Sequence, residues 1–158
     1  MAENKQQDAV QKEDLNDLMR VRREKMEKFR EMGVAPFGHR YEVTRHADEL
    51  LAEFASLGEE AESETEVSIA GRLMAIRGHG KASFAVLMDL SGKIQIYFKL
   101  DVLGEEKYKE FKLLDIGDII GVRGVVFRTR RGELTVRVDD FTLLSKSLRP
   151  LPEKFHRL

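Results

Sequence analysis

Alternating apolar and polar residues fill the chain from residue 67 onward. Short runs rich in β-branched and aromatic residues are separated by glycine-containing turns. This pattern predicts strands near residues 67–77, 83–89, 93–99, 118–129 and 133–145. Between the third and fourth runs, residues 104–115 (GEEKYKEFKLLD) predict a short helix.

The first 66 residues carry a helical pattern instead. Apolar residues recur at helical spacing over residues 13–33, and Gly33 is a natural stop. The many Arg and Lys residues of this helix favour a solvated face with local Glu–Lys pairs, although the face could also lie beside an RNA backbone. Thr44 predicts the N-cap of a second helix that ends near Ala55, and residues 57–66 predict an acidic loop.

The order of these elements predicts the fold class. Three strands, a helix and two strands are the order of an OB fold, a five-stranded Greek-key barrel. We therefore expect a mainly β protein with a helical N-terminal appendage. The expected division is a disordered tail over residues 1–12, the appendage over 13–66, the barrel over 67–146 and a linker over 147–158.

Composition narrows the class of protein. The 158 residues include no cysteine, which excludes disulfides and thiolate metal sites. No apolar run approaches the roughly 20 residues needed to span a bilayer, and the polar, acidic N-terminus is no secretory signal. We expect a soluble, cytoplasmic protein with no membrane partner.

The net charge of −1 conceals an uneven distribution. Residues 1–70 hold 10 Lys/Arg and 17 Asp/Glu, whereas residues 71–158 hold 17 and 11. A basic C-terminal half would attract phosphate backbones, although charge also varies along any chain.

Catalytic and metal motifs are missing from the sequence. It has no glycine-rich phosphate loop, and its four histidines lack the spacing of metal ligands. We therefore expect no catalytic, cofactor-binding or metal-binding residues in this chain.

A nucleic-acid-binding surface remains, because it needs an aromatic platform, cations and polar groups at the base edges. A turn at Ser91-Gly92 would place Met88 opposite Gln95, with Phe84 on the same outward face. Phe84 could stack on a base, and Gln95 and Glu133 could read base edges. The residues that could supply positive charge are Arg77, Lys81, Arg128, Arg130 and Arg131. The plainer alternatives are that Phe84 is core, Gln95 is an ordinary strand residue and Glu133 pairs with an arginine.

Four stretches resemble the N-terminal region of bacterial-type class II lysyl-tRNA synthetases. They are RVRREKMEKFREMGVAPF, VSIAGRLMAIRGHGKASFAVLMDLSGKIQIYF, LLDIGDIIGVRGVVFRTRRGELTVRV and LLSKSLRPLPEKFH. The resemblance implies an anticodon-binding OB domain that recognises the uridine-rich anticodon of a lysine tRNA. It implies stacking by Phe84 and base contacts from Arg77, Gln95 and Glu133. Lys81, Arg128, Arg130 and Arg131 are phosphate candidates on charge alone. Ile76 and His79 depart from the family pattern.

The resemblance also implies a longer enzyme. In that family the linker leads into a catalytic domain, which binds ATP and Mg²⁺ and supplies the dimer core. We therefore expect this chain to recognise tRNA but not to catalyse aminoacylation. Two alternatives remain: a generic single-strand-binding OB module, and a protein-interaction module that uses the helix at residues 13–33.

Overall fold

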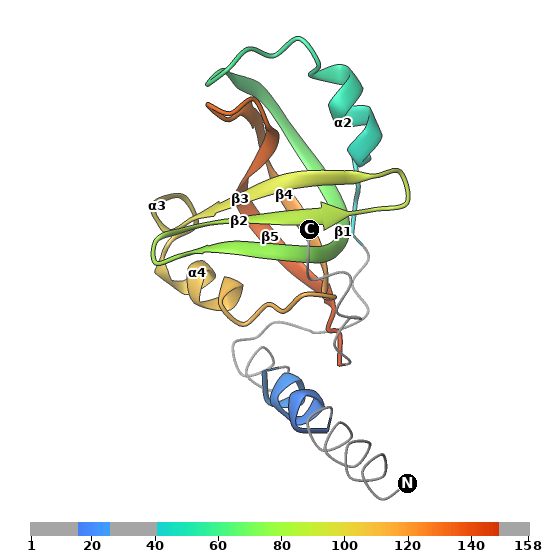
Figure 1. Ribbon diagram of the computed structural model, residues 1–158, viewed down its shortest axis with the longest axis vertical. Helices are drawn as coiled ribbons and strands as arrows, with labels where there is room; N and C mark the ends of the chain where they lie inside the picture. Colours follow the sequence, from blue (N-terminus) through green and yellow to red (C-terminus); the bar gives the residue numbers. More distant parts are fainter. Residues whose placement is uncertain (1–15, 26–40, 149–158) are drawn as a thin grey trace, which may run out of the picture.

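The computed structural model describes residues 16–25 and 41–148, which form a closed five-stranded barrel with flanking helices (Figure 1). The strands are β1 (Glu62–His79), β2 (Ala82–Met88), β3 (Lys93–Lys99), β4 (Ile119–Arg128) and β5 (Leu134–Ser145). Their order around the barrel is β1-β2-β3-β5-β4. Only the β3–β5 pair is parallel; the other four pairs are antiparallel. This arrangement confirms the predicted OB architecture.

Helices lie where the pattern predicts them. Between β3 and β4 the chain forms α3 (Leu100–Leu103) and α4 (Glu105–Phe111), two segments rather than the predicted one. Gly104 separates them because its φ of 87° lies outside the helical region. α2 (Ala47–Glu53) and the helical residues 16–25 lie beyond opposite ends of the barrel (Figure 1). The rest of the predicted helix at 13–33, the tail at 1–12 and linker residues 149–158 lie outside the described residues.

The alternating residues fill the barrel interior as predicted. Ile94, Ile96 and Phe98 of β3 are at most 4% exposed, as are Leu134, Val136 and Val138 of β5. Their partners in the alternation face outward and are half-buried or exposed, except the fully buried Thr135. The barrel therefore keeps a continuous apolar core and leaves one side of β1–β3 available to solvent.

The β2–β3 connection differs from the predicted two-residue turn. Met88 pairs with Lys93, so residues 89–92 form the loop and Gln95 faces Val86 instead of Met88. The Asp89 carboxylate organises this loop by accepting hydrogen bonds from Ser91 and Gly92 and from the backbone N–H of Ala47 in α2 (2.9 Å). The register moves by two residues, so Phe84 and Gln95 keep the same outward face.

These contacts also set the charge state of Asp89. Burial alone would raise its pKa, but the hydrogen bond from the Ser91 hydroxyl and three backbone N–H donors together lower the pKa below its ordinary value. The carboxylate thus holds the loop and the start of α2 in one arrangement.

Two predictions about the N-terminal segment are wrong. Thr44 is not the helix cap: His46 occupies that position, and the Thr44 hydroxyl instead accepts a hydrogen bond from the Ser68 N–H (2.9 Å). The acidic segment 57–66 is not wholly a loop, because β1 begins at Glu62. The Glu62 carboxylate there pairs with the Arg137 guanidinium (2.6 Å). Arg137 is too distant in sequence for the local residue pattern to predict this pair.

A buried ionic cluster joins residues 16–25 to the barrel. The Lys146 ammonium is fully buried and donates to Asp118 (2.6 Å), Asp115 (2.7 Å) and the Leu113 carbonyl (3.2 Å). Asp115 also pairs with Lys25 at 2.8 Å. Burial raises the pKa of Asp118 despite the opposing charge of Lys146. All three Lys146 protons thus have acceptors, which a buried ammonium requires.

Candidate nucleic-acid interface

An open hollow of about 740 Å³ lies on the outer side of β1–β3, beside the β4–β5 turn. We call it the outer hollow. It is lined by Arg77, Gly78, Phe84, Gln95, Thr129, Arg130, Arg131 and Glu133. The four residues expected to contact bases therefore come together from four different strands or turns.

Strand pairing explains this convergence. Arg77 of β1 is directly opposite Phe84 of β2, and Phe84 is opposite Tyr97 of β3. Gln95 lies two residues from Tyr97 on the same face, so it is the diagonal neighbour of Phe84. The corrected register therefore brings Phe84 and Gln95 closer than the predicted turn would have done.

Phe84 is part of an aromatic row. Its ring stacks on Tyr97 with centroids 4.5 Å apart and planes 27° apart, and Tyr97 in turn contacts Phe127 at 6.0 Å. Phe84 is half-buried, so it is neither core nor fully exposed. One ring face rests on protein, which fixes the orientation of the side chain at the edge of the hollow.

Gln95 is held by a neighbour in the parallel strand. Its Nε2 donates to the Thr135 hydroxyl (3.1 Å), which itself donates to the Glu133 carbonyl (3.1 Å). Because the single Thr135 proton is used, Thr135 can only accept from Gln95. The amide orientation is thereby fixed, and the Gln95 carbonyl oxygen has no hydrogen-bond donor among the described residues.

Arg77 and Glu133 contribute unneutralised charges to the outer hollow. Both side chains are exposed, and neither forms an ion pair or side-chain hydrogen bond within residues 16–25 and 41–148. Glu133 does not pair with a neighbouring arginine there. The Glu133 backbone N–H donates to the Thr129 hydroxyl (3.0 Å), which positions this residue at the end of the turn. The hollow thus presents a carboxylate acceptor and a guanidinium donor.

The arginines of the β4–β5 turn divide into two kinds. Arg128 donates to the carbonyls of Leu57 (2.5 Å) and Gly132 (2.8 Å), and its Nη2 donates to two carbonyls at the end of α2, those of Phe54 (3.1 Å) and Ala55 (3.4 Å). Its guanidinium is therefore committed to the protein, and the geometry does not suit the phosphate role suggested by its charge.

Arg130 and Arg131 are the available cations of this turn. The side chain of Arg130 is 88% exposed and forms a surface pair with Glu60 (3.0 Å), a kind of contact that contributes little and exchanges readily. Arg131 is exposed and has no ion pair within the described part of the chain. Lys81 is also exposed but lines a different hollow, beside α4.

Comparison with known proteins agrees with this geometry. Residues 67–144 match the sequence model of the tRNA anti-codon family, described as an OB-fold nucleic acid binding domain. Over this segment the chain is similar to that family. Within the described residues, this OB-fold chain has no helix long and apolar enough to cross a membrane and no cluster of three potential metal ligands.

Its curated relatives include lysine–tRNA ligases. The chain is 50% identical over 153 residues to that of Bacillus cereus (strain AH187), which is 96% of this chain and 31% of the relative. The lysine–tRNA ligase of Carboxydothermus hydrogenoformans is 52% identical over 149 residues, 94% of this chain and 30% of its own length. The chain thus spans about a third of the length of these relatives.

Two supporting residues escaped the sequence interpretation. Tyr97 stacks on Phe84, and Thr135 fixes Gln95. Alternation alone places Tyr97 on the outward face, so that residue could have been found from the strand pattern. Thr135 could not, because its role depends on the parallel β3–β5 pairing.

Proposed function

We propose that the outer hollow recognises the uridine-rich anticodon of a lysine tRNA. The observation that carries this proposal is the convergence of Arg77, Phe84, Gln95 and Glu133 on one hollow in an anticodon-family OB fold. An unstacked base needs a flat apolar face and partners for its edge. Phe84 supplies the face, Gln95 and Glu133 supply acceptors, and Arg77 supplies donors.

Phosphate contacts would come from the outer hollow and from the neighbouring β1–β2 turn. Arg130 and Arg131 extend from the β4–β5 turn, and Lys81 lies near the β1–β2 turn. These contacts would add affinity without sequence preference, because every nucleotide carries the same phosphate. Base choice therefore rests on Phe84 and the polar residues around it.

We further propose that this chain is the tRNA-recognising part of a lysine–tRNA ligase. The support is the 50% identity to such enzymes over 96% of the chain. The proposed whole enzyme attaches lysine to its tRNA with ATP and Mg²⁺, and it works as a homodimer in the cytoplasm. The residues described above contribute recognition to that reaction and none of its bond-making steps.

The test is binding of the 158-residue chain to an anticodon stem-loop with UUU and to the same stem-loop with altered anticodon bases. Fluorescence anisotropy gives both affinities. Tighter binding to UUU is expected. Equal affinity for both loops would refute base-specific recognition and favour a generic single-strand binder.

Phe84→Ala tests the stacking platform. The expected loss is roughly 1–3 kcal/mol of binding free energy, the usual contribution of one stacked base. Val86→Ala is the matched control, because Val86 lies on the same face of β2 but does not line the outer hollow. An unchanged affinity for Phe84→Ala, with the fold verified by circular dichroism, would remove Phe84 from the site.

A further inference from the structure

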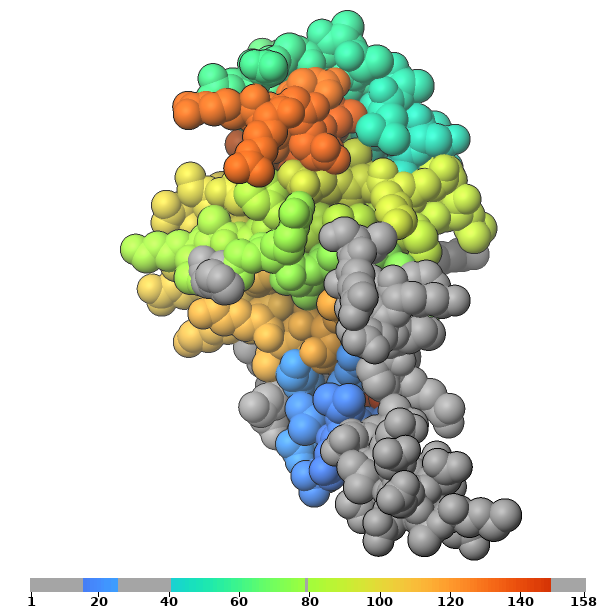
Figure 2. Space-filling model, viewed as in Figure 1, coloured from blue at the N-terminus to red at the C-terminus, as the bar shows by residue number. Residues whose placement is uncertain are grey.

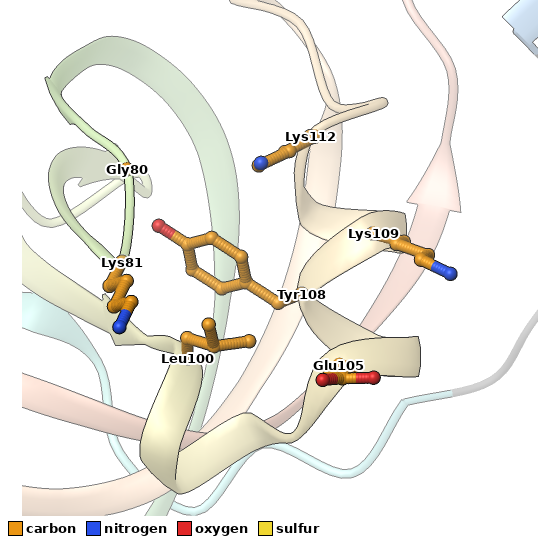
Figure 3. Close-up of a pocket in the computed structure, with 7 residues that line it drawn as sticks. All are labelled: Gly80, Lys81, Leu100, Glu105, Tyr108, Lys109 and Lys112. Carbon is orange, nitrogen blue, oxygen red and sulfur yellow. The ribbon is translucent and has the colours of Figure 1, made fainter.

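A second hollow, of about 450 Å³, lies beside α4 (Figure 3). We call it the α4 hollow. It is lined by Gly80, Lys81, Leu100, Glu105, Tyr108, Lys109 and Lys112. Figure 3 shows Lys81 and Lys112 on either side of the Tyr108 ring, with Lys109 and Glu105 extending from α4 farther from the Gly80 turn. Three lysines and one glutamate therefore line a single depression.

The lysines of α4 differ in their partners. Lys107 is neutralised by Glu110 (3.1 Å) and Asp140 (3.3 Å). By contrast, Lys109 and Lys112 form no ion pair within the described residues, although Lys112 lies 5.6 Å from the centroid of the Tyr108 ring. Lys109 and Lys112 thus bring positive charge to the lining of the α4 hollow, where it would attract an anion.

A third, small hollow of about 180 Å³ shares lining residues with both of these hollows. It shares Gly78 with the outer hollow, and it shares Gly80, Tyr108 and Lys112 with the α4 hollow. Gly78 and Gly80 have φ values of 117° and 69°, conformations that favour glycine, so neither position of the turn carries a side chain. At Gly78 and Gly80 the chain between the hollows therefore presents backbone alone.

The surface view (Figure 2) shows which elements lie between the two hollows. In Figure 2, β1–β3 (green to yellow) cross the face between the β4–β5 hairpin (orange-red, above) and the α4 segment (gold, below). A chain bound in the outer hollow can leave it across the β1–β2 strands toward α4.

We propose that the α4 hollow binds backbone phosphates of the RNA strand that leaves the outer hollow across the Gly78–Gly80 turn. This inference rests on the proposed function of the outer hollow. The cations of the α4 hollow are lysines, which act as point charges. Tyr108 is only 4% exposed, so its ring offers no platform for a base. The α4 hollow therefore adds affinity and fixes the direction of the strand, whereas the outer hollow reads the bases.

The test compares two RNAs on one double variant. Lys109→Gln with Lys112→Gln removes two exposed charges from α4. The probes are a UUU anticodon stem-loop and a short single strand that carries only UUU. Binding of the stem-loop should weaken roughly 3–10-fold at physiological salt, and its salt dependence should become shallower by about one to two phosphate contacts. Binding of the short strand should stay within about twofold of the unmodified chain.

Two controls separate a site from general electrostatics. Arg72→Gln with Lys93→Gln removes the same charge from exposed residues at the far end of β1–β3, and it should leave the salt dependence unchanged. Glu105→Gln removes the one carboxylate that lines the α4 hollow among the described residues and should tighten stem-loop binding.

The outcomes distinguish this inference from the proposed function. Unchanged stem-loop affinity in the double variant overturns the α4 site, even where Phe84→Ala still weakens binding. An equal loss for both RNAs, or for the Arg72/Lys93 control, also overturns it, because the effect is then non-specific attraction. Absence of any stem-loop binding by the unmodified chain overturns both proposals.

Discussion

Arg128 offers a sharp test, because its charge suggests RNA binding while its contacts indicate a structural role. Its guanidinium donates to carbonyls from the end of α2, from Leu57 and from Gly132. Arg128→Ala should therefore destabilise the protein, because it detaches the β4–β5 turn from the segment that follows α2. The same change should leave intrinsic RNA affinity nearly unaffected.

The magnitude follows from the number and environment of these bonds. A hydrogen bond to a charged group contributes about 1.5–3 kcal/mol net. The four acceptors are only partly buried and regain water when the guanidinium is removed, so their contributions do not add fully. We expect a loss of about 2–4 kcal/mol, which lowers the Tm of a domain of this size by roughly 5–15 °C.

The assay is urea unfolding followed by circular dichroism, together with stem-loop binding well below the Tm. Arg131→Ala is the matched control, because Arg131 is an exposed arginine of the same turn. It should change stability by less than about 0.5 kcal/mol but weaken binding to all RNAs and flatten the salt dependence. Arg128→Lys should restore only part of the stability, since the planar guanidinium reaches four carbonyls from three nitrogens, whereas an ammonium has three donors on a single nitrogen. A stable Arg128→Ala variant that loses RNA affinity as Arg131→Ala does would refute this reasoning.

Two further predictions concern carboxylates. Asp89→Asn should lower stability at pH 7 by about 1–2 kcal/mol, and the difference from the unmodified protein should disappear as the pH falls below about 4, because a carboxylate with a lowered pKa contributes stability only while it is ionised. Urea midpoints at several pH values measure this, and a constant difference would contradict it. Lys146→Met should cost about 3–5 kcal/mol because it leaves Asp118 buried without its cation. Adding Asp118→Leu should restore part of that loss in thermal unfolding, and no recovery would contradict the pairing.

Local pattern was sufficient for the strands but not for their connections. Alternation located all five strands because each buries one face in a shared core. The β2–β3 register was wrong by two residues, since Asp89 makes contacts to α2 that lengthen the loop. The start of β1 was missed because acidic residues are poor strand formers until Arg137 pairs with Glu62.

The residues of the candidate site could be predicted where strand alternation shows which side chains face outward. Arg77, Phe84, Gln95 and Glu133 line one hollow, and their roles remain proposals. Charge alone could not show that Arg128 is bound to the protein while Arg131 is exposed. The Arg128 guanidinium donates to carbonyls that lie more than 70 residues away in the chain. The sequence did not single out Lys109 and Lys112 for a related reason. Which lysines remain free to bind an anion depends on the ion pairs that the fold creates, such as those of Lys107.

A sequence motif that is typical of a family does not by itself locate the binding surface. The stretch LLSKSLRPLPEKFH is part of the resemblance to lysyl-tRNA synthetases, yet its Lys146 is fully buried against Asp115 and Asp118. Removing one partner of such a pair is strongly destabilising, so this lysine stabilises the fold whether or not RNA is bound. The stretch therefore contributes to the resemblance through a residue that stabilises the fold. The proposed binding surface rests instead on exposed groups that form no ion pair among the described residues, and these groups line the outer hollow and the α4 hollow.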